Sequence, residues 1–190
     1  MTSNSGGLGR LRAIEESELP LMLSWRNAPA VRRNMYTRHL ISEDEHLRWW
    51  QQVQQSSACE YFMYEFQGSP LGIVGFTRID QVNKNASWAF YAMPDAPRGT
   101  GSRMEMLALD YAFTTLGLHK LYCEVLAFNE AVIKLHQKFG FSVEGVLRQQ
   151  HRVDDRYVDI YCLGLLAAEW TEKREPIMAK LLRISGASNG

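Results

Sequence analysis

Three strand-like segments in the middle of the chain are the strongest constraint on its fold. Residues 61–66, 71–79 and 86–91 are rich in aromatic and β-branched side chains, and the sequences QGSP and DQVNKN between them are typical of turns. Short turns join neighbouring strands that run in opposite directions, whereas parallel strands need a long crossover. We therefore predict an antiparallel meander.

Further elements flank this meander. Ser42 followed by Glu45 is a capping-box pattern that predicts the start of a helix, and Gly117 is placed to end the amphipathic helix that contains Met104 and Leu107. The predicted elements outside the meander are strands at 8–14 and 119–126, helices opened by Pro20, at 43–54, at 104–115 and at 129–139, a hairpin at 141–165, and a last helix at 167–182. Their order, β, α, α, β, β, β, α, β, α, β, β, indicates a mixed α/β (α+β) fold.

The length and the net charge of the chain limit its domain number and its possible partners. A chain of 190 residues is long enough for one domain with a substantial core and short for two. Lys plus Arg and Asp plus Glu each total 21, so no overall charge attracts nucleic acid or an anionic membrane. We expect neither partner.

The ends of the chain and its cysteines indicate a compartment. The first ten residues contain Ser, Asn and Gly where a signal peptide needs an apolar run, and no segment reaches the roughly 18 apolar residues of a membrane span. Cys59, Cys123 and Cys162 are odd in number and lack the spacing of metal ligands. We expect free, buried thiols, no metal, and a soluble cytoplasmic protein whose residues 1–7 and 185–190 are disordered.

A glycine-rich turn with the sequence APRGTGSR, residues 96–103, precedes the amphipathic helix. A helix N-terminus favours anions because its backbone N–H groups and about half a positive charge are directed at them. The residues expected to let the backbone approach, to donate hydrogen bonds or to pair with phosphate are Arg98, Gly99, Thr100, Gly101, Ser102 and Arg103. The turn predicts a pyrophosphate cradle, with an ordinary loop as the alternative. A dinucleotide-binding fold does not fit, because its glycines follow the first strand of a parallel unit.

The element order, this turn and the sequence NEAVIKLHQKFGF at 129–141 together resemble the GNAT superfamily of acetyl-CoA-dependent N-acetyltransferases, over residues 8–165. The turn of that family reads Gln/Arg-x-x-Gly-x-Gly/Ala and binds the CoA pyrophosphate, and Ala96 stands here in the first place. The resemblance implies acetyl-CoA as cosubstrate. It also implies a central mixed, largely antiparallel twisted sheet of about seven strands flanked by helices, with an extra C-terminal helix and tail at 166–190.

The same resemblance implies how the pantetheine arm is held. Two central strands would splay apart, and backbone amides of Phe90, Tyr91 and Ala92 would bind pantetheine. Asn129 is expected to cap its helix, which contributes about 1 kcal/mol. The family pattern makes it a further cofactor contact.

Two ionisable residues are candidates for the chemistry. The helix of the family carries a Tyr near the CoA sulfur, and His136 stands at that position, which implies a proton donor for the leaving thiolate. A satisfied core histidine is the alternative. On strand 119–126, Glu124 has apolar neighbours on its own face, so burial should make its carboxylate a stronger base for the amine, acting through water. A solvated position or a structural salt bridge is the alternative for Glu124.

A narrower resemblance concerns the acceptor. The sequences WRN, NMY, HLRW, LHKLYCEV and EGVLR, which begin at residues 25, 34, 46, 118 and 144, resemble the PseH-type enzymes of pseudaminic acid biosynthesis, a route to flagellin glycosylation. This implies direct acetylation of the 4-amino group of a UDP-linked amino-dideoxy sugar. The residues implied in acceptor binding lie in the first third of the chain: Arg26, Met35, Tyr36, His46 and Trp49.

Alternatives stay open for the acceptor. RimJ/RimL-like protein acetyltransferases and polyamine acetyltransferases share a Trp-Arg-Asn-like element, and a non-catalytic acyl-CoA-binding module is a third reading. Arginines in the early helices, at 26, 32, 33 and 38, favour an acceptor that bears phosphate over a cationic polyamine. A homodimer is compatible with the sequence, which does not fix the oligomeric state.

Overall fold

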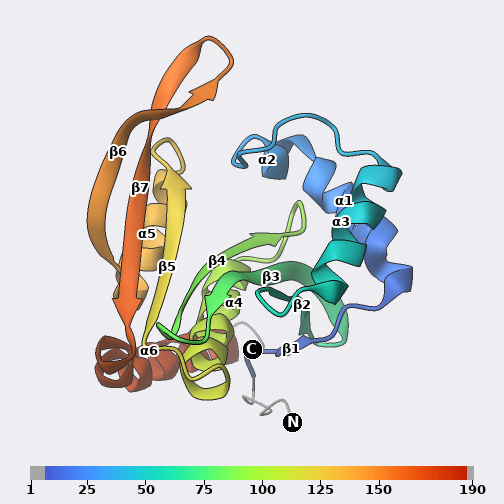
Figure 1. Cartoon of the computed structure of the whole chain (residues 1–190). Coiled ribbons are helices and arrows are strands. Elements are labelled where there is room, and N and C mark those ends of the chain that lie inside the picture. Colours follow the sequence, from blue (N-terminus) through green and yellow to red (C-terminus); the bar gives the residue numbers. More distant parts are fainter. Residues whose placement is uncertain (1–6, 188–190) are drawn as a thin grey trace.

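The structure is a computed structural model that describes residues 7–187 as a seven-stranded sheet with helices on both faces (Figure 1). The disorder expected at the two ends concerns mainly residues 1–6 and 188–190, which lie outside the described residues. The last helix reaches Ala187, five residues beyond its predicted end.

The sheet confirms the predicted meander. Its strands are β1 (Arg10–Arg12), β2 (Glu60–Phe66), β3 (Ser69–Asp80), β4 (Asn85–Ala92), β5 (Lys120–Leu126), β6 (Ser142–Val153) and β7 (Arg156–Leu166). They lie in the order β1-β2-β3-β4-β5-β7-β6, and every neighbouring pair is antiparallel except β4 with β5. The predicted mixed, largely antiparallel sheet of seven strands with a C-terminal helix is therefore confirmed.

The first strand is shorter than predicted. β1 covers three residues rather than 8–14. Gly9 has a φ of +86°, in a region that favours glycine, so the chain bends just before the strand. After the strand, Arg12 pairs with Glu18 at 2.7 Å, and the chain turns away from the sheet into a 3-10 helix at Glu16–Glu18.

Helices cover the two faces of the sheet in two groups. The helices are α1 (Leu19–Asn27), α2 (Pro29–Arg32), α3 (Glu43–Gln55), α4 (Thr100–Asp110), α5 (Glu130–Phe139) and α6 (Ala167–Ala187). Alternate residues of β2 serve opposite faces, because Met63 packs in a cluster with α1 and α3 while Tyr64 packs in the larger cluster with α4. The predicted cap of α3 is present, since the hydroxyl of Ser42 accepts a hydrogen bond from the Glu45 N–H at 3.2 Å.

Two helices differ from their predicted form. The helix predicted at 104–115 begins earlier, at Thr100, and changes at Tyr111–Thr115 into a π-helical turn before Gly117, whose φ is +61°. The last helix is attached through Asp110 of α4, whose carboxylate accepts hydrogen bonds from Arg174 at 2.7 and 2.8 Å and from the Trp170 indole at 3.2 Å. Apolar periodicity alone carries no information about this ion pair.

The parallel strands β4 and β5 splay apart, and this feature positions the site. They pair only at Asn85–Lys120, Ala86–Leu121 and Ser87–Tyr122, although β4 continues to Ala92 and β5 to Leu126. Beyond the third pair, the edges that the two strands turn toward each other have no ladder partner in the described sheet. Figure 1 shows the two strands diverging, with the β6–β7 hairpin extending beyond the end of β5.

Candidate active site

The splayed strands open a cavity of about 390 Å³, here called the central cleft. Its walls come from β4, β5, α5 and the segment after α2. Of the predicted site residues, those that line the central cleft are Met35, Tyr36, Phe90, Tyr91, Ala92, Glu124, Asn129 and His136. The fold therefore brings both candidate catalytic residues and the candidate pantetheine strand to one cavity.

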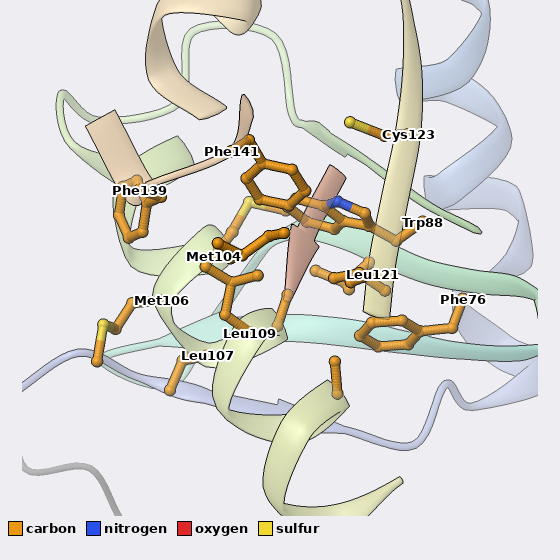
Figure 2. Packing of buried hydrophobic residues seen from close by; sticks show 14 of the residues in the cluster. Phe76, Trp88, Met104, Met106, Leu107, Leu109, Leu121, Cys123, Phe139 and Phe141 are labelled. Carbon is orange, nitrogen blue, oxygen red and sulfur yellow. The ribbon is translucent and has the colours of Figure 1, made fainter. Parts of the chain in front are cut away.

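His136 faces inward, as its helical spacing predicts. Its side chain is 3% exposed, and the rings of Trp88, Phe90 and Phe141 surround it at centroid distances of 5.3, 6.0 and 5.2 Å. Figure 2 shows Phe141 and Trp88 stacked in this cluster, with Cys123 on the adjacent strand. The ring thus has an apolar surround and one side in the central cleft.

The carboxylate of Glu105 contacts the ring of His136 at Nδ1. Glu105 of α4 is fully buried, and its Oε1 lies 2.8 Å from His136 Nδ1. Burial on its own would lower the pKa of His136, but the charge of Glu105 and its hydrogen bond raise that pKa to about 10. Burial raises the pKa of Glu105, against the opposing effect of the imidazolium. The two groups form a buried pair in which each raises or preserves the charge of the other, and only His136 reaches the central cleft.

The prediction that Glu124 is desolvated is wrong. Its side chain is exposed in the central cleft, because the apolar residues beside it on β5 do not cover it once β4 has diverged. Its Oε2 accepts a hydrogen bond of 2.9 Å from the Tyr36 hydroxyl, and burial together with this bond raises the pKa of Tyr36. Glu124 is therefore a solvated carboxylate that faces the cleft.

The glycine-rich turn divides into an outward and an inward part. Gly99 has a φ of +87° and begins α4 as its N-cap residue, and Arg98 and Gly99 are exposed while Gly101 and Ser102 are half-buried. This part presents the start of α4 to solvent without a side-chain cap from the described residues. The predicted cradle of backbone N–H groups is compatible with this geometry.

The side chains of Thr100 and Arg103 do not lie where the cradle needs them. Thr100 is buried and donates its hydroxyl to the Pro97 carbonyl at 2.6 Å. Arg103 turns inward, donates to the Tyr64 hydroxyl at 3.0 Å and lies 4.3 Å from the centre of the Phe66 ring. In this conformation these two side chains stabilise the turn from inside, so a phosphate contact falls to Arg98, Ser102 and the backbone.

Asn129 takes the predicted N-cap position of α5 but not the predicted cap contact. Its carbonyl accepts hydrogen bonds from Val132 and Ile133, while its side chain makes no capping bond. Asn129 also lines the central cleft. Its amide is therefore available to a ligand there.

A second cavity of about 330 Å³, here called the side pocket, lies under α1 and α3 and shares Met35, Ala89, Phe90 and Tyr91 with the central cleft. Four of the five predicted acceptor residues line it, namely Arg26, Met35, His46 and Trp49, while Tyr36 lies in the central cleft. Trp49 stacks on His46 at 5.1 Å and meets Tyr61 edge-on at 5.0 Å. One face of Trp49 is thus already occupied by a ring.

Arg26 gives the side pocket a positive charge. Its Nη2 donates to the Thr37 carbonyl at 3.2 Å, and its buried Nη1 has no hydrogen-bond partner among residues 7–187. Burial lowers the pKa of Arg26, and both burial and the nearby Arg26 lower the pKa of His46. The one carboxylate lining this pocket, Glu45, is hydrogen-bonded to His39 at 3.0 Å.

Glu105 was missed by the sequence reasoning. It is a single carboxylate inside the run MEMLAL of an otherwise buried helix, and that isolation is the signal that could have singled it out. The three cysteines are free, as expected, but only Cys123 is buried while Cys59 and Cys162 are half-buried.

Two kinds of feature are absent from residues 7–187. Three or more His, Cys, Asp or Glu side chains nowhere converge there in a way that could hold a metal ion. Within the same range, no helix combines the length and the apolar character needed to cross a membrane.

Comparison with known proteins places this site in context. The family described as the acetyltransferase (GNAT) domain matches residues 10–142, well over half of the chain. Spermidine N(1)-acetyltransferase from Escherichia coli K12 is 36% identical over 97 residues, which are 50% of this chain and 52% of that protein, so the chain spans about half the length of this relative. The acetyltransferase PseH of Campylobacter jejuni (strain NCTC 11168) is 30% identical over 130 residues, 68% of this chain and 80% of that protein.

A solved structure resembles nearly the whole fold. The crystal structure of spermidine N-acetyltransferase from Vibrio cholerae in complex with CoA and spermine aligns with a TM-score of 0.80 and 26% identity, covering 85% of this chain and 96% of that one. Relatives named spermidine acetyltransferases and the relative named PseH therefore stand at comparable similarity to this chain.

Proposed function

Because the chain belongs to the GNAT acetyltransferase family, we propose that it transfers the acetyl group of acetyl-CoA to an amine, and that the amine belongs to a nucleotide-linked amino sugar. The proposed acceptor is a UDP-linked amino-dideoxy sugar of the kind acetylated at its 4-amino group in pseudaminic acid biosynthesis. The free thiols are compatible with a cytoplasmic enzyme.

The acyl donor would lie along the splayed strands. The exposed start of α4 offers backbone N–H groups to the CoA pyrophosphate, and the unpaired edge of β4 beyond Ser87 offers backbone groups to pantetheine. The side-chain amide of Asn129, which makes no capping hydrogen bond to α5, lies in the same cleft. These features support a thioester placed between Glu124 and His136.

Glu124 and His136 suit the two proton and charge requirements of direct acetyl transfer, at the attacking amine and at the leaving thiolate. The amine nitrogen attacks the thioester carbonyl carbon, the new N–C bond forms, and the C–S bond breaks with its electron pair passing to sulfur. Glu124 is an exposed carboxylate in the cleft and accepts the proton that the amine loses, through water. His136, as a buried donor on α5 that lines the same cleft, stabilises the thiolate that leaves.

The choice of acceptor rests on the Nη1 of Arg26, which is buried and has no hydrogen-bond partner among the described residues, although Nη2 donates to Thr37. A buried donor of a charged group is costly unless an anion accepts from it, and a diphosphate supplies such an anion. The side pocket adjoins the central cleft at Met35 and Tyr91, so an acceptor could place its amine beside Glu124 and its phosphates beside Arg26. A polyamine would bring a second cation to the same pocket.

A polyamine is the second candidate because of one specific observation. The relatives that are named spermidine acetyltransferases match this chain at least as well as PseH does, and one of them was solved with spermine. The exposed carboxylate of Glu124 and the half-buried Glu45 are the groups that a cationic chain could meet.

An assay of thiol release from acetyl-CoA distinguishes between these candidate acceptors. The purified protein is assayed with a UDP-linked 4-amino sugar, the same sugar without UDP, spermidine, and a peptide with a free N-terminus. We expect kcat/KM for the UDP-linked sugar to exceed that for the unlinked sugar by about 10- to 100-fold, since a charged hydrogen bond contributes about 1.5–3 kcal/mol. A preference for spermidine or the peptide would refute the proposed acceptor, and no release with any amine would refute the transferase activity.

A further inference from the structure

Glu105 has no part in the acetyl transfer as described so far. Its carboxylate has no exposed surface, Oε1 lies 2.8 Å from His136 Nδ1, and Oε2 has no hydrogen-bond partner in the described part of the chain. A buried, half-satisfied carboxylate destabilises a fold unless a nearby positive charge compensates it. His136 is the group that can supply this charge.

Stability alone does not explain the pair. A buried ion pair is often no more stabilising than apolar side chains of similar volume in its place. The neighbours of Glu105 on α4 are buried apolar residues such as Met104 and Leu109, so an apolar residue would suit this position. The pair reaches the central cleft through His136, which lines it.

Two polar groups contact the ring of His136, namely the carboxylate of Glu105 at Nδ1 and the thiol of Cys123. Nδ1 is occupied by Glu105, and the rings of Trp88, Phe90 and Phe141 enclose much of the imidazole. Since Nδ1 faces Glu105 and His136 lines the central cleft, Nε2 is the nitrogen that can act on a ligand there. In the neutral ring, with the proton on Nδ1, Nε2 could only accept a hydrogen bond; as an imidazolium it donates one.

We propose that Glu105 is a positioning residue that fixes the ring of His136 and keeps it an imidazolium, so that its Nε2–H stabilises the CoA thiolate as it leaves. This inference rests on the proposed acetyl transfer. The electron pair of the broken C–S bond settles on sulfur, and a positive ring beside it lowers the energy of that charge. Glu105 touches neither substrate in this arrangement and acts only through His136.

The groups that face the ring agree with this role. The titratable groups beside it are Glu105 from α4 and the thiol of Cys123 from β5, whereas the uncharged rings come from Trp88 and Phe90 of β4 and from Phe141, directly before β6. Glu105 is thus the main source of negative charge at the ring, and its removal leaves burial to favour the neutral form.

The direct test measures the thiol of bound CoA. Its ultraviolet thiolate absorbance is followed against pH as the difference between CoA and desulfo-CoA complexes, which cancels the cysteines of the protein. We expect the bound thiol to ionise at least about one pH unit below free CoA in the wild type, a tenfold gain in thiolate. In Glu105→Gln and in the apolar variant Glu105→Leu, we expect this shift to be lost.

Kinetics give the second readout. Glu105→Gln should lower kcat about 10- to 100-fold while the KM for acetyl-CoA changes less than about twofold, with a further fall in kcat as pH rises above the ordinary histidine range. Glu105→Asp should restore part of the activity because it keeps the charge. The matched control is Glu144→Gln, which removes one carboxylate from the exposed ion pair with Lys120 and should leave both readouts unchanged.

Several outcomes would overturn the inference. An unshifted CoA thiol in the wild type, or a shift and kcat that persist in Glu105→Leu, would show that Glu105 does not act through the ring. A wild type that shifts the CoA thiol but acetylates none of the amines would instead refute the proposed function and leave the electrostatic role of Glu105 standing. The thermal midpoint of each variant, measured alongside, shows whether the variant is folded.

Discussion

The two cavities of this protein each contain a buried histidine, and the two rings are driven in opposite directions. In the side pocket, burial and the charge of Arg26 lower the pKa of His46, whose Nε2 has no hydrogen-bond partner among the described residues. In the central cleft, Glu105 outweighs burial and raises the pKa of His136. Burial lowers the pKa of both rings, whose exposed fractions are 6% and 3%, so the opposite sign of the neighbouring charge accounts for the difference between them.

The same contrast extends to the whole of each cavity. The central cleft presents the Glu124 carboxylate and an imidazolium, which are the groups that an amine and a leaving thiolate require. The side pocket presents the guanidinium of Arg26, whose buried Nη1 has no partner among the described residues, beside a histidine whose pKa is lowered, and this suits an anion. An acceptor with an amine at one end and phosphate at the other fits this division.

The largest expected effect is the loss of kcat when the carboxylate of Glu124 in the central cleft is removed. Glu124→Gln keeps the shape of the side chain and its ability to meet Tyr36 but removes the base, so kcat should fall by about 100-fold or more. Steady-state thiol release measures it. Glu130→Gln, which changes an exposed carboxylate paired with Lys134 on α5, is the control and should retain wild-type kcat. Equal rates for Glu124→Gln and wild type would remove Glu124 from the reaction.

The next effect tests the charge of the side pocket. Arg26→Met keeps the length of the side chain and removes its charge, so the KM for a UDP-linked acceptor should rise by about 10- to 100-fold, with kcat nearly unchanged. Arg33→Met, at an exposed position outside both cavities, is the matched control. If Arg26→Met instead improves the use of spermidine and leaves the UDP-linked sugar unaffected, the assignment of the pocket is wrong.

A smaller effect concerns stability against pH. The pKa of His136 in the folded protein, about 10, is raised above the unfolded value of about 6.5, so the folded state holds more protons between these two pH values. The stability from this group is complete below about pH 6.5 and falls as pH rises toward 10, by up to about 1.4 kcal/mol for each pH unit. Urea denaturation at several pH values measures the slope, which should flatten in Glu105→Leu. A wild-type slope that is unchanged by that substitution would contradict the coupling.

The smallest effect concerns the bond between Tyr36 and Glu124. Tyr36→Phe removes a hydroxyl whose hydrogen bond contributes about 0.5–1.5 kcal/mol, so kcat/KM should change by about two- to tenfold. The ring remains, and its edge contact with His151 at 5.0 Å keeps the segment after α2 in place. A loss as large as that of Glu124→Gln would mean that the hydroxyl itself takes part in the reaction.

Local patterns predicted the elements of this protein well, and for an identifiable reason. The cap of α3 needs only Ser42 and the N–H three residues later, and the meander needs only alternating side chains and short turns. The same patterns misjudged Arg103, because a basic residue in a glycine-rich turn can reach outward or inward. Its inward course depends on Tyr64, which is 39 positions away.

The sequence by itself determined the order and type of the elements, the meander, and the helical spacing that turns His136 inward, because these depend on neighbours within a few residues. Only the tertiary structure decided that β4 and β5 diverge after three pairs, that Glu124 stays exposed, and that Glu105 meets His136 across 31 positions. Such contacts join elements whose relative placement comes from packing of the whole core. No local periodicity carries that information.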